Sequence, residues 1–304
     1  MFLSISKASP VLIFLLVFVR AGTGQDLKPV SVAHIIDNKS GKTIDLKGML
    51  QALAFCDVIF LGETHDNDAG HKFQLDVIRE LIEADYDLAI TMEQFERDVQ
   101  GAVDDYLADR ITEDDFLAAS RPWKNYALHY RPIIELAKQH KIPIIAANLP
   151  KSLASNLSAD QPLQFHEQAF AARSTSAPHD RYWTNFVKAM KDHAGADSAE
   201  KMKSFYAAQC AKDDAMAEAI TDFIATNRHR PPIVVHLCGH FHSDYGLGTA
   251  ARVVQRNPML RTAIVTMELI PTTGIPDLKL VRDRAHFTLW TVDNPPKSEP
   301  VTQQ

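Results

Sequence analysis

The chain lacks the residue patterns of several common kinds of site. Its three cysteines, Cys56, Cys210 and Cys238, are odd in number and widely separated, so we expect neither a disulfide scaffold nor a cysteine metal site. There is no Gly-x-Ser-x-Gly elbow and no glycine pattern of a dinucleotide-binding or phosphate-binding loop. The sequence therefore does not predict a serine-hydrolase, Rossmann or P-loop site.

Positive charge is also scarce. Acidic residues outnumber Lys and Arg by 38 to 32, which gives a formal charge of −6, and no basic cluster stands out. This balance argues against a nucleic-acid partner. With 304 residues, 46% of them hydrophobic, the chain is long enough to bury a sizeable core. It contains no internal repeat or low-complexity tract.

Long hydrophobic runs are absent outside the N-terminus. There, Lys7 precedes the nine-residue apolar run Val11–Val19, and the small residues Ala21–Gly24 follow. This order is typical of a secretory signal, whereas a membrane span needs about 20 apolar residues. We expect residues 1–24 to be a signal peptide and the protein to be exported, to the periplasm or outside the cell. An uncleaved anchor is the alternative, and no nearby cysteine supports lipid attachment.

The stretch Asp57–His65 organises the rest of the chain. Val58–Leu61 is a continuous apolar run, typical of a strand buried on both faces of a parallel sheet. Glu63 and His65 follow the run directly. The next residues, Asp66–Asp68, predict the start of an amphipathic helix. An acid and an imidazole are thus expected at the carboxyl end of a core strand, where ligands bind in open α/β sheets.

Further apolar runs predict an α/β fold, a largely parallel sheet flanked by helices, with a helical insertion capping the carboxyl ends of the strands. The domain should cover residues 25–294, leaving 295–304 as a tail. The expected elements are a hairpin from Val30–Ile36 and Ile44, a helix at Leu46–Phe55, strands at Leu88–Met92, Ile142–Ala146, Ile233–Leu237 and Ala263–Met267, an edge strand at Phe287–Val292, and helical insertions at about 94–140 and 151–227.

Polar side chains end these strands, and parallel strands bring such ends to one rim of the sheet. They are Glu63 with His65, Glu93, Asn148, His240 with His242, and Glu268. Two of the ends share the pattern Gly-x-x-His. Glu63, His65, His240 and His242 are donors that Zn²⁺, Mn²⁺ or Fe²⁺ accepts, so a divalent-metal site is one interpretation.

The helical stretches contain further polar and aromatic residues. Trp123, Tyr126 and Tyr130 are spaced to share one helix face, which is more often core packing than a ligand platform. Pro132 predicts a new helix start, with Arg131 outside the α region. Gln209 and Asp213 fall on an apolar stripe, and a buried Asp213 would need a partner unless a bend turns it to water. His71 and His129 could join the site at the rim, although we expect both at the surface.

Several motifs, in order along the chain, resemble those of the ChaN-like haem-binding proteins, which are grouped with the Tiki proteases and erythromycin esterases. The similar segments are Val58–Asn67, Met92–Arg97, Pro122-Trp123 with Tyr126 and Tyr130, Asn148–Pro150, Gln209 with Asp213, Met216-Ala217, Cys238–His242, and Gly246, Gly248 and Arg252. The resemblance covers most of residues 55–270. One departure is the missing cysteine at the signal end, since members are often lipoproteins.

The resemblance implies haem binding linked to iron uptake, with a tyrosine as the iron ligand. Tyr126 and Tyr130 are its candidates, and it implies supporting roles for Asn148, Gln209, Asp213 and Arg252. The expected partner is haem or another small molecule, and a homodimer is left open.

Three functions remain open. The first, which we favour, is haem binding between the rim and the helical insertion, with phenolate ligation of ferric iron. The second is a metal-dependent hydrolase in which Glu63 or Glu93 is the general base. The third is a domain whose inherited site is inactive.

Overall fold

The computed structural model describes residues 32–158, 167–191, 198–270 and 281–291. All of them belong to one compact unit, Ser31–Gln304. The expected signal peptide at 1–24 and the tail at 295–304 lie outside the described residues. No helix in the described ranges combines the length and apolar character that crossing a membrane requires.

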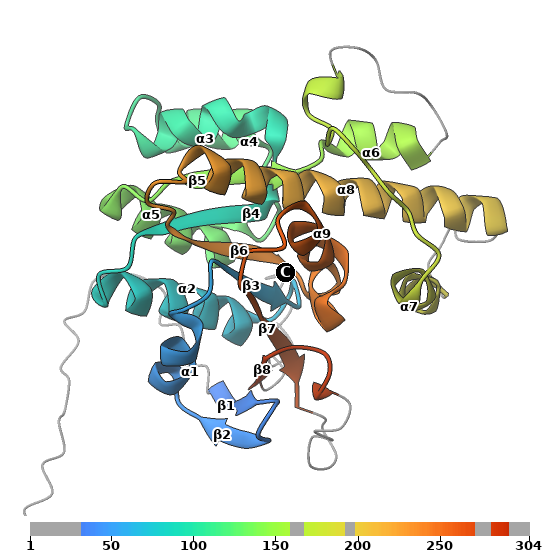
Figure 1. The fold of residues 1–304 in the computed structure, drawn as a ribbon. Coiled ribbons are helices and arrows are strands. Elements are labelled where there is room, and N and C mark those ends of the chain that lie inside the picture. The colour runs from blue at the N-terminus through green and yellow to red at the C-terminus, as the bar shows by residue number, and fades with distance from the viewer. Residues whose placement is uncertain (1–31, 159–166, 192–197, 271–280, 292–304) are drawn as a thin grey trace, which may run out of the picture. The chain divides into compact units, whose positions relative to one another are not determined.

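The described strands form one sheet of eight, in the order β2-β1-β8-β7-β3-β6-β4-β5 (Figure 1). The six strands from β8 to β5 are parallel, while β1 runs antiparallel to β8 and to β2. Their bounds are β1 Val32–Asp37, β2 Lys42–Ile44, β3 Val58–Glu63, β4 Leu88–Glu96, β5 Ile144–Asn148, β6 Ile233–Gly239, β7 Thr262–Leu269 and β8 Phe287–Thr291. The predicted α/β fold with a largely parallel sheet is confirmed.

Strand β3 lies in the middle of the sheet because its apolar run can be buried on both faces. All six of its residues are buried, and Glu63 pairs in register with Gly239 of β6. Two strand predictions need correction. Strand β4 continues past Glu93 to Glu96, because the polar side chains at 93 and 94 find partners inside the protein. Strand β8 is not an edge strand, since it lies between β1 and β7.

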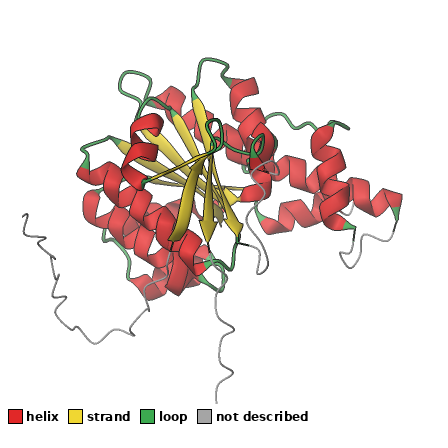
Figure 2. Cartoon of the chain, turned by 90° about the horizontal axis from the view of Figure 1, so that it is seen from below, coloured by secondary structure: helices red, strands yellow, loops and turns green. Residues whose placement is uncertain are grey.

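Helices cover both faces of the sheet (Figure 2). Five helices share a core cluster with one face, and two pack on the other. The first group is α1 Leu46–Leu53, α2 Asp68–Glu83, α3 Gln100–Leu107, α4 Glu113–Ser120 and α5 Arg131–His140, and the second is α8 Ala199–Thr226 and α9 Gly248–Arg256. Helices α6 Lys151–Ser158 and α7 Arg181–Met190 pack against α8. The two predicted insertions thus lie on opposite faces.

A π-helix, Tyr126–Tyr130, runs directly into α5, and this corrects two local predictions. Arg131 has α-helical backbone angles (φ −50°, ψ −46°), because the preference against that region before proline is modest and the packing of the buried Tyr130 overrides it. Pro132 lies in the first turn of α5, where its missing N–H breaks no helical bond. Trp123 precedes the π-helix and so does not share one helix face with Tyr126.

Candidate functional site

Glu63 is buried at the end of β3 inside a ring of hydrogen-bond donors. Its Oε1 accepts from the Tyr130 hydroxyl at 2.5 Å, from His65 Nδ1 at 3.0 Å and from Gln94 Nε2 at 3.2 Å. Its Oε2 accepts from Gln74 Nε2 at 2.8 Å. Burial alone raises the pKa of Glu63, but these donors and nearby imidazole charge outweigh it and hold the pKa below its usual value. The side chain is therefore a buried, fully engaged carboxylate.

His65 is the half-exposed member of this group, with 49% of its side chain accessible. Its ring stands edge-on to Trp123, with centroids 4.9 Å apart, and packs against Gly239, where an added Cβ would lie 2.9 Å from Cε1. Burial lowers the pKa of His65, but the bond to Glu63 and the charges of Glu93 and Glu63 raise it above its usual value overall. The rim thus presents one imidazole oriented by a buried carboxylate.

Beside it, His242 is clamped between two carboxylates. Its Nε2 lies 3.2 Å from Glu93 Oε1, and its Nδ1 donates to Asp213 Oδ1 at 2.7 Å. Burial disfavours the charged ring, yet the two carboxylates outweigh burial and raise the pKa of His242 to about 10. The same contacts and the Gly239 N–H, 2.7 Å from Oε2, hold the pKa of Glu93 far below its usual value despite burial. His242 is therefore an imidazolium between two anions.

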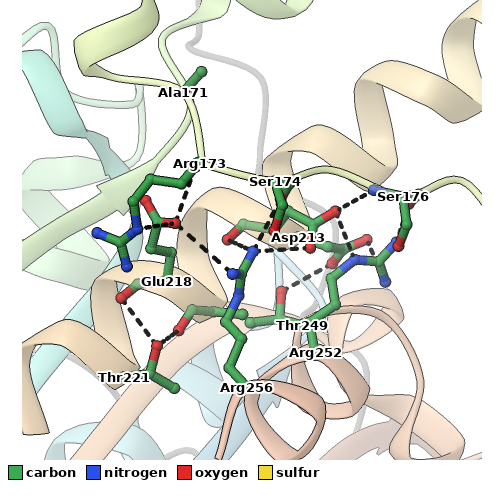
Figure 3. A network of polar contacts seen from close by, with 12 residues as sticks. Ala171, Arg173, Ser174, Ser176, Asp213, Glu218, Thr221, Thr249, Arg252 and Arg256 are labelled. Atoms are coloured by element: carbon green, nitrogen blue, oxygen red, sulfur yellow. Dashed lines mark hydrogen bonds and ion pairs between the residues drawn. The ribbon is translucent and has the colours of Figure 1, made fainter. Parts of the chain in front are cut away.

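Asp213 is fully buried, and the partner that the sequence predicts for it is confirmed. Besides His242 it accepts hydrogen bonds from the hydroxyls of Tyr182 at 2.7 Å and Thr249 at 2.8 Å. The Arg252 guanidinium lies 3.9 Å from it and donates to the backbone carbonyl of Ser176 at 2.9 Å (Figure 3). Asp213 thus joins α7, α8 and α9 to the rim.

Gln209 and Asn148 contact the His242 clamp, which is the pairing of His242 with Glu93 and Asp213. Gln209 Nε2 donates to the Tyr182 hydroxyl at 3.3 Å and lies 3.3 Å from both ring nitrogens of His242, where a charged ring offers no acceptor. Asn148 donates through Nδ2 to the backbone carbonyl of Glu93 at 3.0 Å. Both residues therefore contact members of the clamp, Asn148 through Glu93 and Gln209 through His242.

Two residues of the predicted rim belong instead to a second polar cluster. His240 Nδ1 lies 2.9 Å from Asp244 Oδ2 and 3.0 Å from Arg284 Nη2. Glu268 pairs with Arg284. These residues lie on the β7 and β8 side of the rim, so the strand ends divide into two groups rather than one.

Two histidines and two tyrosines near the Glu63 group are buried. His71 and His129, expected at the surface, stack at 4.0 Å, and His71 Nδ1 lies 3.7 Å from Glu63. Tyr126 and Tyr130 belong to the hydrophobic core. Burial raises the pKa of both phenols, and the hydroxyl of Tyr126 has no hydrogen-bond partner among the described residues.

The predicted metal ligands do not converge on a point. Among the residues that the structure describes, no group of three or more His, Cys, Asp or Glu side chains is arranged to hold a metal ion. Glu63 and His242 are saturated by protein donors and carboxylates, and His240 lies in the other cluster. The divalent-metal interpretation therefore has no support from this geometry.

A hollow of about 810 Å³ opens beside the Glu63 group. It is lined by the end of β4, by the turn that contains Pro122 and Trp123, and by the first turn of α6. Two of its lining residues belong to the rim network, since Gln94 donates to Glu63 and Trp123 contacts His65. Its volume is within the range of small-molecule sites.

Sequence reasoning missed several of these residues. Gln94 looks like the first residue after a strand, and only its amide bond to Glu63 shows why it is buried. Tyr182 lies in a helix that carries no distinctive motif, 31 positions from its partner Asp213. No short-range signal could have found this long-range pair, whereas Gln94 and Trp123 both lie within segments that resemble the family.

These features define an α/β protein with a buried carboxylate–imidazole network at the carboxyl rim of a parallel sheet and a hollow next to it. The chain belongs to the family described as haem-binding uptake, Tiki superfamily, ChaN, whose sequence profile matches residues 49–253. The resemblance inferred from the motifs is thereby confirmed. A search among curated proteins gives no match.

The solved structure of one ChaN protein supports the same fold. The chain is similar to ChaN of Campylobacter jejuni, described for cofacial haem binding, with 18% identity, a TM-score of 0.64, and 84% of this chain and 95% of that chain covered. It is more distantly similar to the type III effector HopBA1 (13%, TM-score 0.48, 82% and 94% covered). A mutant erythromycin esterase, EreC, also matches (12%, TM-score 0.46, 85% and 82% covered).

Proposed function

We propose that this protein binds haem in the hollow beside Trp123, as cargo for uptake. The observation that carries the proposal is the hollow itself, in a member of a haem-binding family. Haem is a flat apolar ring with two carboxylates at one edge. Pro122 and Trp123 offer an apolar wall, and the cations Lys124 and Lys151 stand on the same lining. The apolar wall suits the face of the porphyrin and the lysines suit its acidic edge, while the two acids of the lining, Glu96 and Asp98, are paired with Arg121.

The candidate iron ligands differ in burial, since Tyr126 and Tyr130 are buried and His65 is half-exposed. Ligation by a tyrosine, which the resemblance implies, would require a phenol to leave the core, because Tyr130 is bonded to Glu63 and Tyr126 is enclosed. His65 is half-exposed and contacts Trp123, which lines the hollow, so it would not have to leave the core. A metal-bound histidine commonly donates its other ring N–H to a carboxylate, as His65 Nδ1 does to Glu63. We therefore propose His65 as the iron donor, with Tyr126 and Tyr130 as the alternative.

Titration with haemin, followed by visible absorption, tests the proposal. Wild type should give a saturable shift of the Soret band, and His65→Ala should alter the bound spectrum. His140→Ala, an exposed histidine at the end of α5, is the control and should match wild type. If ferric-phenolate bands appear and vanish in Tyr126→Phe or Tyr130→Phe, the ligand role passes to that tyrosine. An unsaturable, non-specific response in wild type would contradict haem binding.

A hydrolase is the second candidate, and one observation favours it. His65 is an exposed imidazole held by a buried carboxylate, which is how a general base is commonly oriented. Metal analysis of the purified protein, before and after haemin addition, separates the two functions. Stoichiometric Zn, Mn or non-haem Fe that is present before haemin is added, is lost in His65→Ala and His242→Ala, and is kept in both tyrosine variants would favour the hydrolase.

Export and assembly form part of the proposal. A signal peptide at residues 1–24 would place haem binding outside the cytoplasm. The mature chain would then begin near Gln25, which its mass would show. Size-exclusion chromatography of the haemin-loaded protein tests the homodimer.

A further inference from the structure

We propose that the hollow recognises the carboxylate groups of its ligand through Lys124 and Lys151. This inference rests on the proposed haem binding and adds which groups of the porphyrin are bound and by which side chains. Neither lysine belongs to a motif or a basic cluster of the sequence.

The two lysines are the uncommitted cations of the hollow. Both are exposed, and within the described ranges neither ammonium group forms an ion pair. Arg121, the third cation on the lining, is already engaged, because its Nη2 lies 2.7 Å from Glu96 Oε2 and 2.7 Å from Asp98 Oδ1. Negative charge on a ligand would therefore meet the lysines and not the arginine.

The N-terminus of α6 adds to the positive electrostatic potential that the two lysines create in the hollow. Lys151 is the first residue of this helix and lines the hollow. The first N–H groups of a helix have no partner within the helix, and the helix dipole is positive at this end. A carboxylate near Lys151 would thus face backbone donors as well as the ammonium group.

Gln94 gives a second, independent indication that a polar group of a ligand binds in the hollow. Its side chain is 3% exposed and lines the hollow. The Glu63 carboxylate fixes the amide nitrogen at 3.2 Å, so Oε1 is an acceptor. That oxygen is buried and has no hydrogen-bond partner among the described residues. Unpaired buried acceptors are rare in proteins, and a water held between this oxygen and a ligand carboxylate would supply the missing hydrogen.

The expected ligand chemistry is therefore an apolar planar body with acidic groups at one edge. The ring would lie against Trp123, and its acidic edge would reach the lysines. Because exposed charge pairs are screened by salt, this contribution to binding should weaken as ionic strength rises. A ligand whose carboxyl groups are esterified should lack this electrostatic contribution altogether.

Binding of three probes to the full-length mature protein tests the inference, with tryptophan fluorescence quenching as the readout. The probes are haemin, metal-free protoporphyrin IX and haemin dimethyl ester. In the double variant Lys124→Gln, Lys151→Gln the first two should bind about tenfold more weakly at low salt, as expected for losing two exposed charge pairs. The ester should bind wild type and variant equally. The control Lys188→Gln, an exposed lysine on α7 away from the hollow, should leave all three affinities unchanged.

The possible failures are distinct. If haemin binds wild type saturably but the ester binds as tightly, and the double variant changes nothing, the carboxylate inference is overturned while haem binding stands. If neither haemin nor protoporphyrin binds wild type saturably, haem binding itself is overturned and the inference falls with it. Thermal unfolding of the double variant should match wild type, since both lysines are exposed.

Discussion

Replacing Asp213 with alanine is expected to lower the free energy of unfolding by about 3–5 kcal/mol, because the buried His242 ring loses one of its two carboxylate partners and two buried hydroxyls lose their acceptor. The Asp213 carboxylate is fully buried and bonded to the imidazolium of His242 and to two hydroxyls. Urea denaturation at neutral pH measures the change. Asp222→Ala is the matched control on the same helix, since its ion pair with Arg173 is exposed and should contribute at most about 1 kcal/mol.

A second variant separates charge from packing. Asp213→Asn keeps the size and some of the hydrogen bonds but removes the charge, so its cost should fall between those of wild type and Asp213→Ala. A loss below about 1 kcal/mol for Asp213→Ala, similar to the control, would mean that the clamp does not hold the fold.

The stability of the protein should fall as pH rises from about 6.5 to about 10. The clamp raises the pKa of His242 from 6.5 to about 10 in the folded protein, because Glu93 and Asp213 outweigh the effect of burial. A group that binds its proton more tightly when folded stabilises the fold fully below its unfolded pKa. That contribution is lost as pH passes through the folded value, and it should amount to several kcal/mol.

Urea denaturation of wild type and His242→Gln across this pH range isolates the effect. The variant starts less stable at pH 6.5, and its stability should fall less steeply as pH rises. Other groups that titrate in the range, such as lysines and tyrosines, are common to both proteins and cancel in the difference. Parallel stability curves for the two proteins would show that His242 is not charged in the folded state.

The sequence could predict the central strand and its polar end because both signals are local. The run Val58–Leu61 cannot be exposed without a large cost, and Glu63 and His65 follow it directly. The apolar stripe of α8 likewise predicts that Asp213 needs a partner. In both cases the physical constraint applies within one element, so neighbouring residues reveal it.

The partners of these groups could not be predicted, since they are separated by long stretches of chain. Polar residues at 93 and 94 look like a strand end, although Glu93 pairs with His242 and Gln94 donates to Glu63 inside the protein. The separation of His240 from His242 depends on Asp244 and Arg284. The position of β8 between β1 and β7 depends on pairing across the whole sheet. These features follow from tertiary contacts, which no local pattern records.

The most direct test of haem binding at the rim is to locate the iron. Crystals of the haemin-loaded protein, measured at the iron absorption edge, give the iron position from anomalous scattering. We predict an iron peak next to His65, with the porphyrin against Trp123 in the hollow. A peak elsewhere on the chain, or no peak at saturating haemin, would contradict the account.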